Sequence, residues 1–467
     1  MRVMFCCQSY TAVGGVESWL TQLCRRLPAI GWEPIIALAK GVNEHRPERF
    51  RQWYPDLPTI EIDGSHLDYD GRVRAVMRSL RQHRPSLVVP LSLVEAYDAA
   101  CHAKAAGLDI RVLARIAGNF PEQMADLRRY RDFIDMVAGV AALNVAMAIR
   151  WAGIQPSRVR RAYCGVDPPL PDVTAKANDG RLRLGLVSRL EQHDKRVLDL
   201  IPLCRRLREQ SVEYVLDIVG DGSCFDELRS ALAGDIARGR VRMHGWLSKE
   251  DIYRRIYPHL DVILLLSAYE GFPNVLPEAM VHGAVPVIAE YLGCRAEGFI
   301  EPETTGLTFA VADTEGAAAC IKRLAEASSL RERLSAQAHQ RAASECSWDR
   351  SMQHWRAFFE DAMSLPPMRS GSLPPLQKTS AGRLDRWPIP PWARDTVRQF
   401  RGRWFGAAVT HAEEWAFCGR DHSPEMLAEI EQFARELDQK PAEISHAAGI
   451  ARRCEMRGTG RPTASGV

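Results

Sequence analysis

The chain is most constrained by an alternation of short apolar runs with helix-periodic stretches, which predicts strands and helices in turn. Continuous apolar strands separated by helices are typical of a parallel sheet that is covered on both faces. In the first part of the chain, helices are expected at Glu17–Ile30, Gly71–His83 and Pro121–Val137. The strands expected there are Val3–Cys7, Pro34–Ala39, Leu87–Leu91, Arg111–Ile116 and Gly139–Leu143.

The alternation restarts after residues 167–180, whose prolines and glycine predict a linker. The expected strands are Arg183–Val187, Tyr214–Val219, Val241–Met243, Val262–Leu266 and Val285–Ala289. The expected helices are Arg196–Glu209, Cys224–Ala233, Lys249–Tyr257, Val275–His282, Gly316–Ala327, Ser329–Ser344 and Trp348–Met363. The sequence therefore predicts an α/β fold of two doubly wound parallel-sheet (Rossmann-like) domains facing across a cleft, plus a mainly helical C-terminal extension. Ligands of such sheets bind beyond the carboxyl ends of the strands.

Composition narrows the class of protein further. The 467 residues are 46% hydrophobic and 25% charged, which is ordinary for a soluble globular chain, and the net charge of +3 does not indicate a nucleic-acid partner. The twelve cysteines are scattered, which favours free thiols in a reducing cytosol. The longest weakly polar run, Ile134–Ile149, contains Asp135 and Asn144, so no membrane span is expected. We expect a cytoplasmic protein.

The most informative segment is Glu270–Glu278, which follows an expected strand and opens a helix. Its glycine permits close backbone approach, and a helix start offers N–H groups to a phosphate. Its two carboxylates are natural acceptors for sugar hydroxyls, and each such charge-assisted hydrogen bond contributes about 1.5–3 kcal/mol. The alternative is that Glu278 only complements the helix dipole and Glu270 is a solvated loop charge.

Two cations follow the first strand of the same domain. Arg189 and Lys195 belong at the strand-end edge, where arginine can hold a diphosphate by its fork and lysine as a point charge. The alternative is a solvated loop.

Two further strand ends carry candidate nucleotide contacts. Gly220 and Gly222 end the second strand in the manner of a tight turn with a helix cap, which needs no function, although a nucleotide role is equally open. Trp246 and Leu247 end the third strand, where they can hold a nucleobase or simply pack.

Together these residues resemble the retaining nucleotide-sugar glycosyltransferases of the GT-B fold, specifically the large family four. The Glu-x7-Glu hallmark of that family is matched by Glu270 and Glu278. Its Arg-Leu…Lys motif, its Val-Gly-x-Gly turn and its Gly-rich loop are matched by Arg189–Lys195, Val219–Gly222 and Val13–Glu17. The resemblance runs from residue 1 to about 364 and is most specific in Leu182–Phe309.

The resemblance implies a role for each matched residue. Glu278 would bind the ribose hydroxyls, Glu270 would touch the transferred sugar near its anomeric carbon, and Arg189 and Lys195 would neutralise the leaving diphosphate. Gly15 would approach the phosphates from across the cleft. Backbone N–H groups would be offered to the sugar and the distal phosphate by Gly271, Phe272, Pro273, Asn274 and Val275.

The resemblance also implies the reaction. A hexose-type sugar would move from a UDP- or GDP-linked donor to a glycan or lipid-linked acceptor with retention of anomeric configuration, with no cofactor and no metal. Asp68-Tyr69-Asp70 is interpreted as a helix cap and not as a metal site. The family's histidine is absent between His102 and His193, and Asn119 occupies its expected place on the sugar or acceptor side. The glycine usual after the family's lysine is replaced by Arg196.

The expected organisation is an acceptor-side domain at 1–166 with a crossing helix at 348–364, a donor domain at 167–347, and an extension at 365–467. Two other functions remain open. One is a non-catalytic nucleotide-sugar-binding or scaffolding protein of the same fold, and the other is a nucleotide-sugar epimerase. A dinucleotide-dependent dehydrogenase fits poorly because neither first strand leads into Gly-x-Gly-x-x-Gly.

The extension opens with basic residues interleaved with aromatic ones between residues 365 and 405. Such a stretch suits peripheral contact with an anionic membrane near a lipid-linked acceptor, but a tail that packs its aromatics on the core is slightly preferred. Glu413–Phe417 and Pro424–Leu437 predict acidic amphipathic helices. A zinc site needs more than the three loosely spaced candidates His411, Cys418 and His422.

Overall fold

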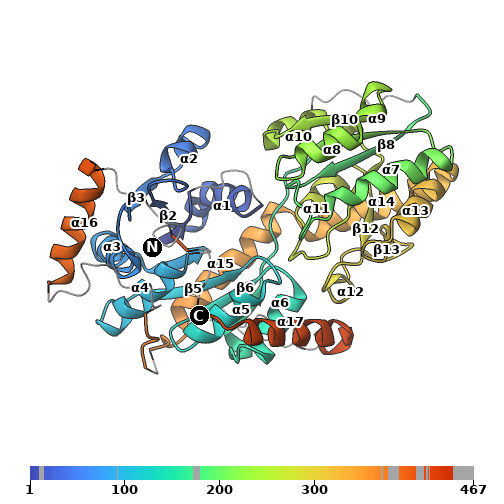
Figure 1. The fold of residues 1–467 in the computed structure, drawn as a ribbon. Coiled ribbons are helices and arrows are strands. Elements are labelled where there is room, and N and C mark those ends of the chain that lie inside the picture. Colours follow the sequence, from blue (N-terminus) through green and yellow to red (C-terminus); the bar gives the residue numbers. More distant parts are fainter. Residues whose placement is uncertain are drawn as a thin grey trace, which may run out of the picture. The chain divides into compact units, whose positions relative to one another are not determined.

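The computed structural model describes residues 1–9, 15–91, 93–171, 179–369, 372–376, 389–405, 415–416, 419, 421–444 and 447 (Figure 1). The chain divides into two compact units. Unit 1 comprises Met1–Ala162, Met352–Leu437 and Glu443–Val467, and unit 2 comprises Tyr163–Ser351 and Asp438–Ala442. Most of the C-terminal extension thus belongs to unit 1.

Unit 1 is built on a seven-stranded sheet with the order β3-β2-β1-β4-β5-β6-β7. Its strands are β1 Arg2–Cys7, β2 Glu33–Lys40, β3 Thr59–Asp63, β4 Leu87–Leu91, β5 Arg111–Ile116, β6 Met136–Gly139 and β7 Val159–Arg161. Its helices are α1 Gly15–Arg26, η1 Leu27–Ile30, α2 Pro47–Trp53, α3 Tyr69–His83, α4 Val94–Ala105, α5 Pro121–Tyr130, α6 Ala142–Arg150, η2 Pro156–Arg158, most of α15 Trp348–Ser364, α16 Pro391–Phe405 and nearly all of α17 Pro424–Asp438.

Unit 2 is built on a six-stranded sheet with the order β10-β9-β8-β11-β12-β13. Its strands are β8 Leu182–Val187, β9 Tyr214–Val219, β10 Val241–Gly245, β11 Val262–Leu265, β12 Val285–Ala289 and β13 Leu307–Phe309. Its helices are η3 Val197–Asp199, α7 Leu200–Glu209, α8 Phe225–Ala231, α9 Ala233–Ala237, α10 Lys249–Arg255, η4 Tyr257–His259, α11 Val275–Met280, α12 Cys294–Glu297, α13 Thr314–Glu326 and α14 Ser328–Glu345.

Every pairing between the named strands is parallel, and this confirms the predicted pair of doubly wound sheets. The core of unit 2 shows why these sequences form such sheets. Central strands bury alternate residues such as Leu184 and Leu264 against helices whose apolar stripes include Leu203 and Ile321. The intervening residues, such as Ile263 and Ile288, are fully buried as well, so both faces of the sheet are covered, which explains why its strands are almost continuously apolar.

Two predicted elements in unit 1 have the wrong bounds. The helix expected over Pro121–Val137 ends at Tyr130, and the strand expected at Gly139–Leu143 lies at Met136–Gly139, with α6 beginning at Ala142. Both β6 and most of α6 are buried, so the run has no polar face whose period would separate strand from helix.

Helix α15 packs on unit 1 through aromatic side chains. The ring centroids of Trp355 and Trp19 are 5.2 Å apart, and those of Phe359 and Trp32 are 4.8 Å apart. Trp355 and Phe359 are fully buried, so this helix contributes core residues to the first sheet domain.

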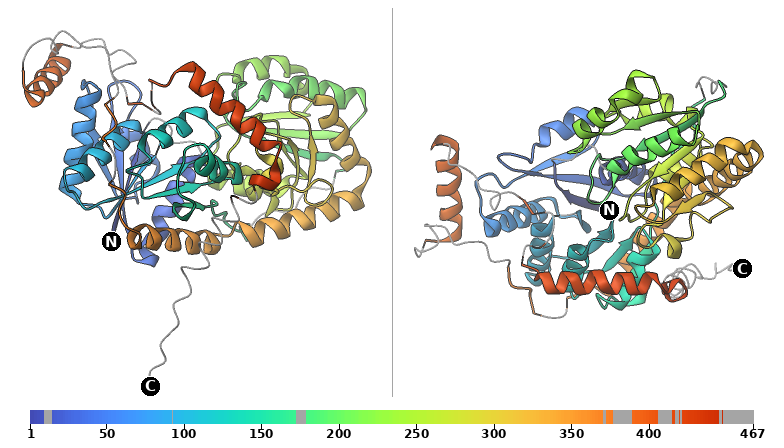
Figure 2. Two further views of the ribbon diagram at one scale, coloured as in Figure 1. Left: turned by 90° about the horizontal axis from the view of Figure 1, so that it is seen from below. Right: turned by 45° about the vertical axis from the view of Figure 1, so that its right-hand side comes forward.

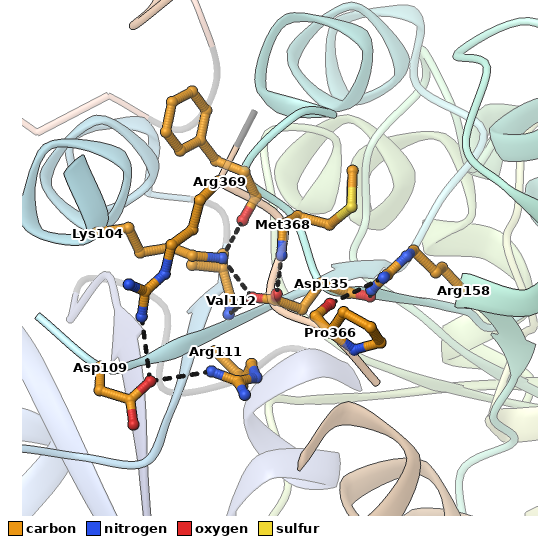
Figure 3. A network of polar contacts seen from close by, with 10 residues as sticks. Lys104, Asp109, Arg111, Val112, Asp135, Arg158, Pro366, Met368 and Arg369 are labelled. Atoms are coloured by element: carbon orange, nitrogen blue, oxygen red, sulfur yellow. Dashed lines mark hydrogen bonds and ion pairs between the residues drawn. The ribbon is translucent and has the colours of Figure 1, made fainter. Parts of the chain in front are cut away.

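The start of the C-terminal extension is held by a buried carboxylate (Figure 3). Asp135 Oδ2 lies 2.6 Å from Lys104 Nζ, and Asp135 Oδ1 accepts a 2.8 Å hydrogen bond from the Met368 N–H. Arg158 donates both to the Asp135 carbonyl and to that of Pro366, at 3.0 and 2.8 Å. Lys104 and Asp135 are each 1% exposed, so the pair is sealed from water.

The extension then reaches the carboxyl-end edge of the first sheet. Trp415 is buried and donates its indole N–H to the carbonyl of Lys40, the last residue of β2, at 2.9 Å. Ala416 donates its N–H to both Glu95 carboxylate oxygens at 3.3 Å and accepts from the Val94 N–H at 3.2 Å. Because Val94 opens the helix after β4, the tail forms part of this edge of unit 1.

We predict that Asp135→Asn lowers the free energy of unfolding by about 3–5 kcal/mol, because it leaves the Lys104 ammonium buried without a counter-charge. Urea unfolding measures the change. In the double variant Lys104→Met/Asp135→Leu no charge remains in this position, so part of the loss should be recovered. A single variant within about 0.5 kcal/mol of the parent would contradict the prediction.

Candidate active site

The loops after β8 and β11 are joined by an ion pair between Lys195 and Glu270. Lys195 Nζ lies 2.8 Å from Glu270 Oε1, which also accepts a 2.7 Å hydrogen bond from the Ser267 hydroxyl. The Ala268 N–H donates to the carbonyl of Asp194 at 2.9 Å. Since β8 and β11 are neighbours in the sheet, two residues that the sequence predicted separately meet at one strand-end edge.

Arg189 is held at the same edge by a carboxylate to which sequence reasoning assigned no role. Its Nη2 donates to Asp194 Oδ2 at 2.7 Å, and Lys195 Nζ lies 3.8 Å from the same oxygen. Asp194 is buried, whereas 55% of the Arg189 side chain is exposed. The guanidinium is thus positioned by one bond and still open to a ligand from solvent.

Glu278 lies in the first turn of α11 and has two further partners that the sequence analysis missed. Tyr257 donates its hydroxyl to Glu278 Oε2 at 3.0 Å, and Lys249 Nζ lies 3.4 Å from Oε1 and 2.9 Å from Asp167 Oδ2. Lys249 begins α10, which follows β10. This position after the end of a strand is the sequence signal that could have identified Lys249 as a site residue.

Burial and the neighbouring carboxylates shift the pKa values of Lys249 and Tyr257. Burial lowers the pKa of Lys249, but the charges of Glu278 and Asp167 outweigh it, and the net shift is upward. Burial, followed by the Glu278 charge, raises the pKa of Tyr257 well above its usual value, so its hydroxyl remains a donor. The two Glu278 side-chain oxygens thus face a hydroxyl donor and an ammonium, and a carboxylate can accept further hydrogen bonds from the hydroxyl groups of a ligand.

Both positions after β9 require glycine because the backbone there lies very close to the loop after β8. Gly220 has φ +138°, and a Cβ there would lie 1.8 Å from the Ser188 carbonyl oxygen. Gly222 has φ +155°, and its Cβ would lie 2.6 Å from the Leu190 carbonyl oxygen. A side chain at either position would push the two loops apart.

The helix cap expected in this turn is absent. Ser223 donates its hydroxyl to Glu191, and its N–H bonds the same carboxylate at 3.1 Å. Helix α8 has Cys224 at its N-cap, with no side-chain cap bond. The serine therefore links the loops after β8 and β9 instead of capping the helix.

The other residues that are predicted to bind the nucleotide-sugar donor differ in their exposure to solvent. Trp246 is 43% exposed and Leu247 half-buried, so part of the indole surface is open to solvent. Phe272 is buried against the rings of Tyr163 and Phe299, with centroids 4.7 and 5.0 Å away, and only its backbone can serve a ligand.

The segment Gly271–Val275 leads into α11, and Pro273 within it is buried. The side-chain oxygen of Asn274 is buried, and it has no hydrogen-bond partner among the described residues. A buried acceptor of this kind is costly to leave unpaired, so a hydroxyl or amide of a ligand would satisfy it.

Two predicted residues lie in unit 1. Gly15 opens α1, while Val13–Gly14 lie outside the described residues. Asn119 accepts a 2.6 Å hydrogen bond from the side-chain amide of Asn144, which also donates to the Gly118 carbonyl at 3.1 Å. Asn144 is fully buried and fixes the turn after β5, a role that its place in an apolar run did not reveal.

The possible metal ligands lie in two places, at Asp68-Tyr69-Asp70 and in the C-terminal extension. Asp68 is the N-cap of α3 and accepts from the Gly71 N–H at 2.8 Å, which confirms the predicted cap. His422 pairs with Asp126 at 2.8 Å, and the other two zinc candidates fall outside the described residues. Across the described ranges, no group of three or more His, Cys, Asp or Glu side chains is placed to hold a metal ion.

Two Rossmann-like units with their polar loops at the strand ends define the class of GT-B proteins. Residues 181–327 match the family "Glycosyl transferases group 1".

Curated relatives agree with that assignment. The lipopolysaccharide 1,6-galactosyltransferase of Escherichia coli (strain K12) is 22% identical over 52% of this chain and 67% of its own length. That of Salmonella typhimurium is 25% identical over 66% and 84%. The fold also resembles Anabaena HepE, solved with UDP and glucose, at a TM-score of 0.63 and 18% identity over 78% of this chain and all of that one.

We predict that Gly220→Ala destabilises unit 2 by about 2–4 kcal/mol, because the new methyl group meets the Ser188 carbonyl at a left-handed backbone position. Thermal unfolding and nucleotide titration would both report it. Gly234→Ala is the matched control, since it lies in α9 and its nearest neighbour is a flexible arginine tip. Equal unfolding temperatures for the two variants would contradict this account.

Proposed function

We propose that this chain transfers a hexose from a UDP- or GDP-linked donor to a glycan or lipid-linked acceptor, with retention of anomeric configuration and without a metal ion. The observation that carries the proposal is the meeting of Lys195 and Glu270 at the strand-end edge of unit 2. Arg189 lies beside this pair because both Arg189 and Lys195 contact Asp194, and Glu278 is the second glutamate of the segment that begins at Glu270. The proposal is supported by the group 1 family match and by the galactosyltransferases among the relatives.

The charge of each site residue determines its proposed role. The diphosphate gains negative charge as the sugar leaves, and Arg189 and Lys195 provide the positive charge that stabilises it. Glu278 accepts hydrogen bonds from the ribose hydroxyls, while Glu270 faces the transferred sugar. Trp246 and Leu247 lie on the nucleobase side. Among the two donor classes we favour UDP, because HepE is solved with UDP, UDP and glucose, and UDP-glucose.

The proposed sugar transfer needs no redox step and no covalent enzyme intermediate. The acceptor hydroxyl attacks the anomeric carbon from the face that the nucleotide leaves, and the bond to the diphosphate oxygen breaks. The departing phosphate oxygen takes the proton of the acceptor hydroxyl. Gly15 and Asn119 belong to the phosphate and acceptor sides of this proposal.

The acceptor side of the proposal rests on the relatives. Two of them are named lipopolysaccharide galactosyltransferases, and we propose a lipid-linked or polymeric glycan as acceptor for this chain. No helix in the described part of the chain has the length and apolar character to cross a membrane. We propose a cytoplasmic enzyme that meets such an acceptor by peripheral contact through residues 365–405.

We predict that Glu278→Gln weakens nucleoside diphosphate binding about tenfold or more, because a neutral amide replaces the carboxylate that accepts from the ribose. Calorimetric titration of UDP, GDP and ADP into the full chain measures the change and identifies the base. Glu326→Gln is the control, since Glu326 ends α13 on the surface with 66% of its side chain exposed. Wild-type protein that binds none of the three nucleotides would overturn the proposed function.

We predict that Lys195→Ala lowers kcat for sugar transfer or donor hydrolysis about 10²–10³-fold, because the leaving diphosphate loses one of its two stabilising cations. Lys322→Ala, on the outer face of α13, should leave the rate unchanged. Proton NMR of the fresh product assigns the anomeric configuration, and an inverted product would refute retention. Assays with excess EDTA test independence from divalent metal.

A further inference from the structure

Helix α16 exposes an unusual amount of apolar surface. Trp392, Val397, Phe400 and Trp404 are 70%, 45%, 60% and 73% exposed. Their spacing places them on one side of the helix, and the rings of Phe400 and Trp404 are 6.1 Å apart. The expectation that the tail packs its aromatics on the core is therefore wrong for these side chains. Large exposed side chains gathered in this way mark an interaction surface.

The opposite side of α16 is fixed to unit 1. Asp395 is buried and accepts two hydrogen bonds from Arg74 at 2.9 and 2.7 Å. Arg398 pairs with Asp68, and a Cβ on Gly402 would lie 2.2 Å from the His66 ring. Figures 1 and 2 show α16 at the periphery of unit 1, beside α3. The aromatic face is therefore presented outward by specific contacts on the other side.

The charges of α16 favour an anionic partner. The helix carries Arg394, Arg398, Arg401 and Arg403 against one acidic residue, Asp395. Asp395 and Arg398 are paired with Arg74 and Asp68 of unit 1. Arg401 is exposed at the border of the aromatic face. Tryptophan and arginine are the residues that prefer the headgroup level of a bilayer, where an amphipathic helix lies parallel to the surface.

We propose that α16 is a membrane-docking helix. Trp392, Val397, Phe400 and Trp404 enter the boundary between headgroups and acyl chains of an anionic bilayer, and Arg401 contacts lipid phosphates. This inference deepens the proposed peripheral location by naming the surface that touches the membrane. Docking by α16 involves none of the donor-site residues in unit 2, so it is measured independently of sugar transfer.

The test is co-sedimentation of the full chain with vesicles of phosphatidylcholine alone or with one quarter phosphatidylglycerol. We expect binding to the anionic vesicles, and the triple variant Trp392→Ala/Phe400→Ala/Trp404→Ala should reduce the partition coefficient at least about tenfold. Arg401→Gln should reduce it about fivefold, and only on the anionic vesicles. Trp53→Ala is the matched control, because Trp53 is exposed on α2 and should leave binding unchanged.

Two further measurements keep the proposal falsifiable. UDP titration into the triple variant checks that the chain is folded, and a nucleotide affinity equal to that of the parent would show that only the surface has changed. If the parent does not bind UDP but still binds vesicles, the proposed function fails while the docking proposal stands. Light scattering distinguishes self-association. Membrane docking would be overturned if the parent chain binds neither kind of vesicle. It would also be overturned if the triple variant loses only the ability to form a dimer.

Discussion

The candidate active site depends on the parallel pairing of all strands in unit 2. Parallel strands end on the same edge of a sheet, so their following loops converge although they are far apart in the sequence. Lys195 follows β8, Lys249 follows β10 and Glu270 follows β11, and all three arrive at one edge. Glycines at 220 and 222 allow the loop after β9 to approach that after β8, and this close approach keeps the edge compact.

Charge compensation explains how this edge remains stable without a ligand. Two cations in partly buried loops would repel each other, but Asp194 and Glu270 provide counter-charges at 2.7 and 2.8 Å. Glu278 is balanced in the same way by Lys249. A nucleoside diphosphate would offer phosphate oxygens to the same cations, so binding exchanges internal ion pairs for ligand contacts. The exchange weakens the ion pairs of the largely buried Asp194 and Glu270 carboxylates, so ligand contacts must outweigh that cost.

Local patterns predicted both sheets and the residues that follow their strands. Strands such as Tyr214–Val219 and Val285–Ala289 were placed at their observed bounds because apolar runs between turn residues leave few alternatives. The pairs Tyr257–Glu278 and Asn144–Asn119 were not foreseen, since they join side chains that only the folded chain brings together. The helix that begins at Pro121 ends earlier than predicted, because residues 133–148 are buried throughout and show no period that separates β6 from the helices around it.

The orientation of α16 is a second feature that the local sequence does not predict. Its sequence contains aromatics and arginines in alternation, and nothing local decides which side is buried. The buried side is determined by Asp395 and its partner Arg74, which lie 321 residues apart in the chain. Once that carboxylate is buried, the helix cannot rotate without leaving Asp395 unpaired, so the face with Trp392 and Trp404 must point outward. The long-range ion pairs of Asp395 with Arg74 and of Arg398 with Asp68 thus convert an ambiguous tail into an oriented surface on unit 1.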